Sequence, residues 1–390
     1  MLQAKNSAGK LVTLANLPKQ HIEHLRKFET FYCPACNHPL IIRAGKSVIP
    51  HFAHQRKSTC TLSSNGESAD HQSAKLHLLQ WLRNQQIDAQ LEVYLPTIKQ
   101  RPDILVAYRG RTFAIEYQHT VTNQKIVRQR SEGYQTLNII PIWLLGANFF
   151  KRTSSISFQV TDWTLQFLHQ FSDELPTMQY YFSPNQQQIL IVHDLYLVNR
   201  RRAYANFSFQ SLKRLTFKEM FDQEKLSQKQ LILQWRREKR NFRLSPEKPF
   251  GKELKWRRWL YEQGYDKEQL PSIVHLPITT QHYFNVPPWN WQSRFIIGFL
   301  HKLQIGQTFT LQSVHRFLRH FLYQKTDYPL IKAVKSPVLP YLQLLANLHY
   351  VKQMDENLFM KHREVIFYDH VEQALAGDDE LLRYIMYNHI

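Results

Sequence analysis

Two carboxylates in the first half of the chain are spaced so that they could hold a metal ion together. Asp103 follows a proline and opens an apolar run, and Glu116 lies in a second apolar run after a turn at Arg109-Gly110. If that turn is a two-residue hairpin loop, Asp103 lies directly opposite Glu116. Like charges facing each other, with Cβ atoms about 4.5–5.5 Å apart, destabilise a sheet. A divalent cation, Mg²⁺ or Mn²⁺, would offset that cost, so we predict Asp103 and Glu116 as its ligands.

Four further residues are candidates for the same site. Gln118 lies two positions after Glu116, so the two side chains share one face of the strand. In the helix expected ahead of the strands, Glu67, His71 and Lys75 recur every four residues and line one helix face. There Lys75 would supply a positive charge and Glu67 a further metal ligand. The S-x-x-E pattern that ends at Glu67 also matches a capping box, in which Glu67 would bind the backbone instead.

A cluster of cysteines and histidines precedes these residues. Cys33 and Cys36 form a C-x-x-C pair, which is followed by His51-x-x-His54 and then by Cys60, the last of the 3 cysteines. Thiolates and imidazoles at this spacing are typical of tetrahedral zinc sites. We predict Cys33 and Cys36 as ligands, completed by two of His51, His54 and Cys60. A closed site of four ligands would stabilise a small module and would not catalyse a reaction.

The elements that must position the two carboxylates alternate in type. Apolar residues recur at helical spacing, then at alternate positions, and then in a run that is apolar on both faces. The last pattern is typical of a central strand. The expected order is αβββαβ, with a helix over about 66–86, strands near 90–95, 103–108 and 112–118, a helix near 123–136 and a strand at 138–145.

Composition narrows the class of protein. The chain has 390 residues, of which 43% are hydrophobic, and this excludes a disordered protein and favours two or three domains. The few cysteines favour the cytoplasm over secretion, and no apolar run is long enough to span a bilayer, so no membrane partner is expected. A formal charge of +19 favours a nucleic acid partner.

The ordered motifs F-Y-C-P-A-C, I-P-H-F-A-H, E-S-A-D-H-Q-S-A-K, R-P-D and A-I-E-Y-Q resemble the competence protein CoiA family over about residues 1–150. The acidic pair within the αβββαβ order is also similar to the PD-(D/E)XK nuclease signature, in which a lysine stands where this chain has Gln118. The resemblance implies a metal-dependent deoxyribonuclease with a structural zinc ion, and it implies that Gln118 is a family trait. It also implies a cytoplasmic factor that processes incoming single-stranded DNA for RecA-dependent recombination in natural transformation. The alternatives are a non-catalytic recombination mediator and a zinc-stabilised docking protein for a recombinase.

Basic residues gather in the middle of the chain among aromatic residues, a pattern typical of single-strand binding. Trp235, Phe242 and Trp256 could stack on bases or belong to the core. The end of the chain fits a winged-helix-like unit or a helical docking domain, with helices at Leu311–Tyr323 and Val338–His349 and a hairpin that joins 350–352 to 358–361. The predicted DNA contacts are Lys125, Arg128, Arg200, Arg201, Arg236, Arg240 and Arg257.

The predicted fold class is α/β, with a PD-(D/E)XK-like αβββαβ nuclease core, an N-terminal zinc-binding module and a largely helical C-terminal region. The expected domains are a zinc-ribbon-like module at 1–62, the nuclease-like domain at 63–150, a basic DNA-binding extension at 151–270 and an aromatic-rich helical domain at 271–390. The predicted catalytic set is Glu67, Lys75, Asp103, Glu116 and Gln118.

Overall fold

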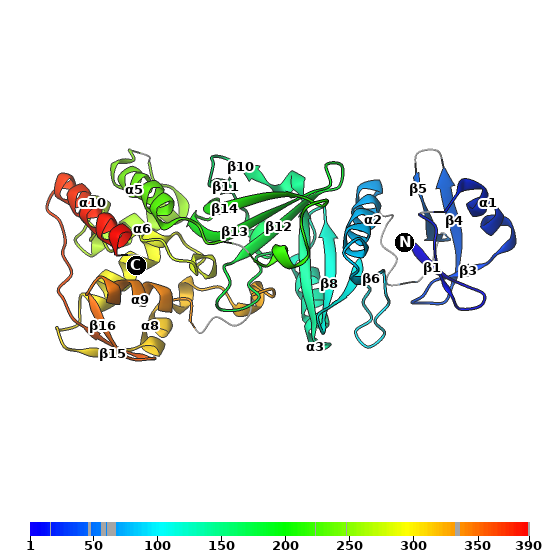
Figure 1. Cartoon of the computed structure of the whole chain (residues 1–390). Helices are drawn as coiled ribbons and strands as arrows, with labels where there is room; N and C mark the ends of the chain where they lie inside the picture. The colour runs from blue at the N-terminus through cyan, green and yellow to red at the C-terminus, as the bar shows by residue number, and fades with distance from the viewer. Residues whose placement is uncertain are drawn as a thin grey trace.

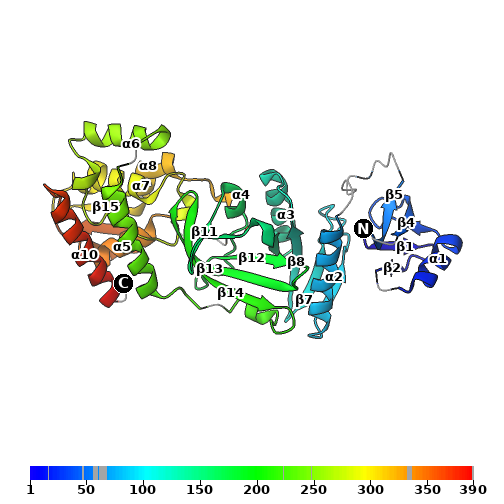
Figure 2. The ribbon, with the colours of Figure 1, turned by 90° about the horizontal axis from the view of Figure 1, so that it is seen from above.

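The computed structural model describes residues 1–15, 17–45, 48–55, 60, 68–222, 224–246, 248–331 and 336–388. They form three bodies in a row, a small β module, a large sheet flanked by helices, and a mainly helical body (Figures 1 and 2). Glu67 and the capping box that was expected there lie outside the described residues. The mixed α/β class that the sequence predicts is confirmed.

The first body is a five-stranded sheet covered by one helix, α1 (Lys19–Phe28). Its core contains Phe31, Phe52 and the buried Cys33. In strand order, the sheet consists of β2 (Leu11–Thr13), β1 (Gln3–Asn6), β3 (Phe31–Tyr32), β4 (Pro39–Gly45) and β5 (Val48–His54).

The second body begins with the expected αβββαβ order. Its elements are α2 (Ala69–Arg83), β6 (Asp88–Leu91), β7 (Ile104–Tyr108), β8 (Arg111–Gln118), α3 (Gln124–Thr136) and β9 (Ile139–Gly146). The hairpin register is confirmed, because Tyr108 lies opposite Arg111 and Ile104 lies opposite Ile115. Two boundaries differ from expectation. The helix begins at Ala69, where the Ser68 side chain caps it. The strand expected near 90–95 ends at Leu91, because Glu92 has a positive φ of 48° that breaks the extended backbone.

The sheet extends past the boundary expected at residue 150. Because β9 is apolar on both faces, it needs a neighbour on each edge, and β12 pairs parallel to it along Leu144–Gly146. Residues 151–211 therefore complete the same sheet, in the order β10-β11-β14-β13-β12-β9-β8-β7-β6. The added elements are β10 (Lys151–Arg152), β11 (Ser157–Gln159), α4 (Asp162–Leu165), β12 (Met178–Ser183), β13 (Gln188–Asn199) and β14 (Arg202–Ser211).

The third body is mainly helical, as expected. Its helices are α5 (Gln228–Leu244), α6 (Gly251–Glu262), α7 (Pro288–Phe295), α8 (Leu311–Leu318), α9 (Leu339–Asn347) and α10 (Val371–Tyr387). The expected hairpin is confirmed, since β16 (Val351–Asp355) pairs with β17 (Leu358–Lys361), and β15 (Thr308–Thr310) adds a third strand. Trp235 and Trp256 are fully buried, so these two rings belong to the core and do not stack on DNA.

Short helical turns connect the main elements. One is a π-helical turn, Ile296–Leu300, and the others are 3₁₀ turns at Ala147–Phe149, Lys218–Met220, Lys267–Gln269, Gln281–Tyr283, Arg319–Phe321 and Lys325–Asp327. Over the described part of the chain, no helix combines the length and the apolar character that crossing a membrane requires.

Candidate functional site

Asp103 lies at the start of β7, facing α2. Its Oδ2 accepts hydrogen bonds of 2.9 Å from the backbone N–H of Tyr117 and from Nε2 of His71. Lys75, one turn further along the same helix, places its Nζ 4.0 Å from Oδ1. Burial alone would raise the pKa of Asp103, but the charge and hydrogen bond of His71, with Lys75 and the Tyr117 amide, lower it well below its usual range. The carboxylate is therefore ionised at neutral pH.

Lys75 has a second and closer carboxylate partner in Glu92. Both side chains are buried, and Nζ of Lys75 donates a hydrogen bond to Oε1 of Glu92. The other oxygen, Oε2, accepts hydrogen bonds from the backbone N–H groups of Leu2 at 2.8 Å and Gln3 at 3.3 Å. The backbone N–H of Glu92 also binds the carbonyl of Asp103 at 3.1 Å. Glu92 thus connects the first strand of the small module to the candidate site.

Glu116 is held from the other flanking helix, α3. Its Oε1 accepts hydrogen bonds from the guanidinium of Arg130 and the hydroxyl of Tyr134, and its side chain is only 6% exposed. Burial raises the pKa of Glu116, and the nearby charge of Asp103 raises it further, whereas Arg130 opposes both. From the sequence, we expected a divalent cation to offset the repulsion between the two facing carboxylates. In the structure, side chains of α2 and α3 already offset part of this repulsion.

The donor chemistry at this site fits a hard cation. All the protein hydrogen bonds of Asp103 fall on Oδ2, and all those of Glu116 fall on Oε1, among the contacts of the described residues. Each carboxylate therefore keeps one oxygen that has no hydrogen-bond donor from the described chain. Carboxylate oxygens completed by water are the ligands that Mg²⁺ and Mn²⁺ prefer.

The other predicted catalytic residues are placed differently. The amide of Gln118 donates to the carbonyl of Thr120 at 2.6 Å and is turned toward its own loop. Lys75 lies beside Asp103 as expected, but its side chain is fully buried, so it acts on the site through its charge. From the sequence, His71 was a candidate without a role. In the structure, its Nε2 forms a hydrogen bond with the carboxylate of Asp103.

Sequence reasoning missed several residues that build this site. Asp70 accepts a hydrogen bond of 2.9 Å from the Tyr117 hydroxyl, and Ser68 shares one of 2.9 Å with His119. Both contacts tie the first turn of α2 to the end of β8. Glu92 was also missed. In the strand expected near 90–95, the alternation of side chains would have placed Glu92 on the solvent face. The motif D-H-Q-S-A-K was the one signal available for Asp70.

The ion pair between Arg130 and Glu116 leads to a first prediction. Substitution of Arg130 by methionine leaves a buried carboxylate without its cation, so we expect the free energy of unfolding to fall by about 3 kcal/mol. Lys125→Met on the same helix is the control, because Lys125 is exposed, and it should change stability by less than about 0.5 kcal/mol. Urea titration measures both variants. Equal effects would show that the pair does not stabilise the sheet.

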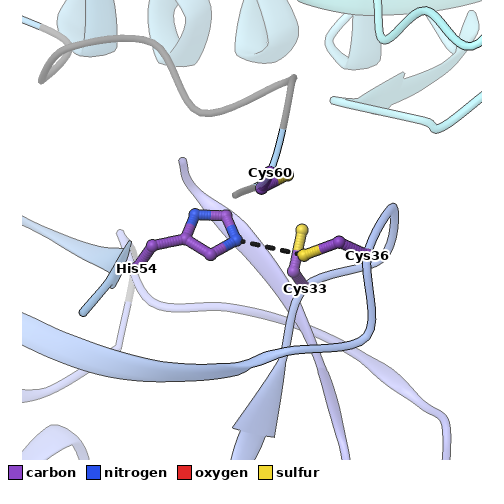
Figure 3. Close-up of side chains that lie close together, drawn as sticks. All are labelled: Cys33, Cys36, His54 and Cys60. Atoms are coloured by element: carbon purple, nitrogen blue, oxygen red, sulfur yellow. Dashed lines mark hydrogen bonds between the residues drawn. The ribbon is translucent and has the colours of Figure 1, made fainter. Parts of the chain in front are cut away.

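The cysteine and histidine cluster is brought together in the small module (Figure 3). The ligand atoms of Cys33, Cys36, His54 and Cys60 all lie within 4.8 Å of one another, and Cys36 Sγ is 3.3 Å from His54 Nε2. His51 lies outside this group, since its Nδ1 binds the carbonyl of Ile49 at 2.9 Å. The structure thus favours the alternative in which Cys60 replaces one histidine.

Burial governs the electrostatics of this cluster. Burial raises the pKa of the Cys36 thiol to about 11, and hydrogen bonds with Cys60 and Cys33 raise it further. Burial also lowers the pKa of His54. A bound cation reverses the effect on the thiols, because metal binding displaces their protons. This Cys₃His cluster is compatible with structural zinc.

The predicted DNA contacts have varied surroundings. Lys125, Arg201 and Arg240 are exposed, and Arg128 is half-buried. The other three contact carboxylates of the chain: Arg200 pairs with Asp162, Arg236 with Asp379 and Arg257 with Glu253.

Comparison with known proteins covers all three bodies of the structure. Three models of competence protein CoiA match the chain: its N-terminal domain over 14–63, its nuclease-like domain over 67–225 and its C-terminal domain over 229–375. This chain belongs to the competence protein CoiA family. Competence protein CoiA of Bacillus subtilis (strain 168) is 28% identical over 281 residues, which cover 70% of this chain and 72% of that protein. No solved structure matches.

The CoiA nuclease-like domain spans the whole nine-stranded sheet. Its match ends at residue 225, after β14, which is the last strand of this sheet along the chain. The match to the CoiA C-terminal domain starts at residue 229, at the beginning of α5. The boundaries expected at 150 and 270 therefore fall inside two CoiA domains. The first CoiA domain contains the Cys₃His cluster.

Proposed function

We propose that this CoiA protein is a metal-dependent DNA nuclease with a PD-(D/E)XK-like core, which hydrolyses phosphodiester bonds of incoming DNA in natural transformation. The observation that carries the proposal is the pair Asp103 and Glu116, which lies at the ends of adjacent strands. Each carboxylate is fixed by one oxygen and offers the other. The nuclease-like family match over the same strands supports it.

The chain's own residues prepare this site. Asp103 and Glu116 would hold a divalent cation, which would supply an activated water and neutralise charge on the phosphate. His71 and the Tyr117 amide fix the orientation of Asp103, and the charge of Lys75 keeps it ionised. Arg130 and Tyr134 fix Glu116 from the opposite helix. Without a lysine at position 118, Lys75 is the positive charge nearest to Asp103 apart from His71.

The positive balance of the chain supports DNA as the partner. The Cys₃His cluster supports a structural zinc ion, which would stabilise the small module. We place the protein in the cytoplasm, where incoming single-stranded DNA is handed to RecA-dependent recombination.

The test uses the full chain with labelled single- and double-stranded DNA under Mg²⁺, Mn²⁺ or EDTA. We expect metal-dependent cleavage that Asp103→Asn lowers by about 100-fold or more, because removal of a metal ligand exceeds the effect of its supporting contacts. The matched control is Asp88→Asn, an exposed carboxylate on the neighbouring strand β6. It should cleave like the natural protein.

Two other outcomes would change this conclusion. Cleavage that survives in Asp103→Asn would place the active site elsewhere. DNA binding with no cleavage under either metal would favour the recombination mediator, in which Asp103 and Glu116 are structural. The pairing of Gln118 with Thr120 and the burial of Lys75 are the observations that favour this second function.

A further inference from the structure

A cavity lies at the junction between the large sheet and the helical body. Its walls come from the β13–β14 turn at 199–201, from the end of α5 and from the start of α6. Figure 2 shows α5 and α6 in the helical body beside the sheet. Its volume is about 530 Å³. Sites for molecules of nucleotide size occupy about 300–1,000 Å³. None of the contacts at Asp103 or in the Cys₃His cluster involves this region.

The cavity is lined by five cations and two carboxylates. Both carboxylates are already engaged. Glu238 accepts hydrogen bonds from Arg202 and the Tyr204 hydroxyl, and Glu253 binds Arg257 at 3.2 Å and the indole of Trp289 at 3.2 Å. Three of the cations, Arg201, Lys248 and Lys252, are exposed and have no carboxylate partner among the described residues. The rim is therefore positive and suited to an anion.

The inner wall of the cavity is aromatic. Phe242 and Trp289 pack with ring centroids 5.4 Å apart, and each contacts the ring of His275 at 5.1 and 5.0 Å. At the mouth, the ring of Phe250 is 85% exposed. Aromatic walls behind a positive rim are what binding of single-stranded nucleic acid uses, with bases on the rings and phosphates on the cations.

His275 is the unusual residue of this wall. It is 1% exposed, and neither ring nitrogen has a hydrogen-bond partner among the described residues. Burial and the charge of Lys239 lower its pKa well below the usual range, so the ring is neutral. A neutral imidazole has one donor and one acceptor, and buried polar atoms left without partners are rare in proteins. Both nitrogens are covered by the protein, so His275 contributes to this wall through its ring contacts with Phe242 and Trp289.

We propose that this cavity takes up one unpaired base of single-stranded DNA, with Phe250 and Trp289 against the base and Lys252 and Arg201 against the flanking phosphates. The proposal rests on the DNA-binding part of the proposed function. A base inside a duplex is stacked on both faces and paired, so it could enter such a cavity only after being flipped out, at a cost in unpairing and unstacking energy. The site therefore selects single strands and accepts every base, because each base has a stacking face.

The test measures binding of a labelled single-stranded oligonucleotide and of the same oligonucleotide with abasic sites, at fixed salt and with no Mg²⁺ or Mn²⁺ added, so that no cleavage occurs. Phe250→Ala is the main variant, because an exposed ring can be removed without harm to folding. Tyr261→Ala, a 78% exposed ring on α6 outside the cavity, is its matched control. Lys252→Gln is paired in the same way with Lys255→Gln on α6.

We expect the natural protein and both controls to bind the intact strand about 10-fold more tightly than the abasic strand. Phe250→Ala should lose most of that preference, and Lys252→Gln should weaken binding to both strands alike. Duplex should compete poorly. If the natural protein binds single strands but Phe250→Ala keeps the full preference for bases, the cavity is not the base site, while the proposed function stands. If the natural protein binds no DNA, the proposed function itself fails.

Discussion

Substitution of Glu92 by alanine is expected to lower the free energy of unfolding by about 3–5 kcal/mol, the range for removal of one partner of a buried ion pair. Both Glu92 and Lys75 are almost completely buried, so the substitution leaves the ammonium group of Lys75 in an apolar environment. It also leaves the backbone N–H groups of Leu2 and Gln3 without their acceptor. Urea unfolding measures the change.

The loss should lie toward the upper end of this range, because Glu92 binds both the Lys75 ammonium group and the backbone N–H groups of Leu2 and Gln3. Leu2 is fully buried in the core beneath α2, with Leu78 and Leu82. When the acceptor on Glu92 is gone, this strand end has less to hold it in the core. We therefore also expect β1 to become accessible to limited proteolysis before the large sheet unfolds.

The effect of Glu92→Ala should depend on pH. Burial alone would raise the pKa of Glu92, but the charges of Lys75 and Arg101 lower it to about 2. The unfolded carboxyl has a pKa near 4.3. The stabilisation is present above that value and is lost as the pH falls through 2. The charge-dependent part of the difference between the natural protein and the variant should therefore be full at pH 7 and vanish only below about pH 2.

Glu23→Ala provides the control, since Glu23 forms an ion pair with Arg26 whose side chains are 44% and 38% exposed. Such exposed pairs contribute less than about 1 kcal/mol. Equal stability losses in the two variants, or a loss in Glu92→Ala that does not change with pH, would show that Glu92 does not act as a buried charge.

The parts of the site that were predictable depend on local rules. The register of β7 and β8 follows from a tight turn at Arg109-Gly110 and from the alternation of side chains, and the pairing from Ile104 opposite Ile115 to Tyr108 opposite Arg111 confirms it. Cys33 and Cys36 come together because a short C-x-x-C loop holds such residues close, whereas spacing left open which two of His51, His54 and Cys60 would join them.

The parts that were not predictable depend on contacts between distant elements. Glu116 is held by Arg130 and Tyr134. These two residues lie on a polar helix, and nothing in its sequence pattern predicts that their side chains face the sheet. Glu92 turns inward only because its backbone adopts a positive φ, which is uncommon for glutamate. The extension of the sheet to β14 could be read only from the need of β9 for a second neighbour. Pairing between distant strands leaves little local signal.

The second large effect is expected from the cluster of Cys33, Cys36, His54 and Cys60. Cys33→Ser should remove the bound zinc and unfold the small module, because apparent binding energies of structural zinc are about 10–16 kcal/mol. The first body has a core of few residues, so a metal site contributes much of its stability. The metal content of the purified protein, with the loss of signal from this module in hydrogen exchange, measures the effect.

The two histidines of the same strand make a matched pair for this test. His54 lies within the cluster, whereas His51 binds the carbonyl of Ile49. We expect His54→Ala to lose the zinc as Cys33→Ser does, and His51→Ala to keep one zinc per chain. Zinc lost from His51→Ala and retained in His54→Ala would reverse the ligand assignment, and a natural protein without zinc would leave the cluster as a group of buried thiols. Because β1 joins this module to Glu92 and Lys75, zinc removal by a chelator should also weaken the hold on Asp103 and slow DNA cleavage when Mg²⁺ is supplied in excess.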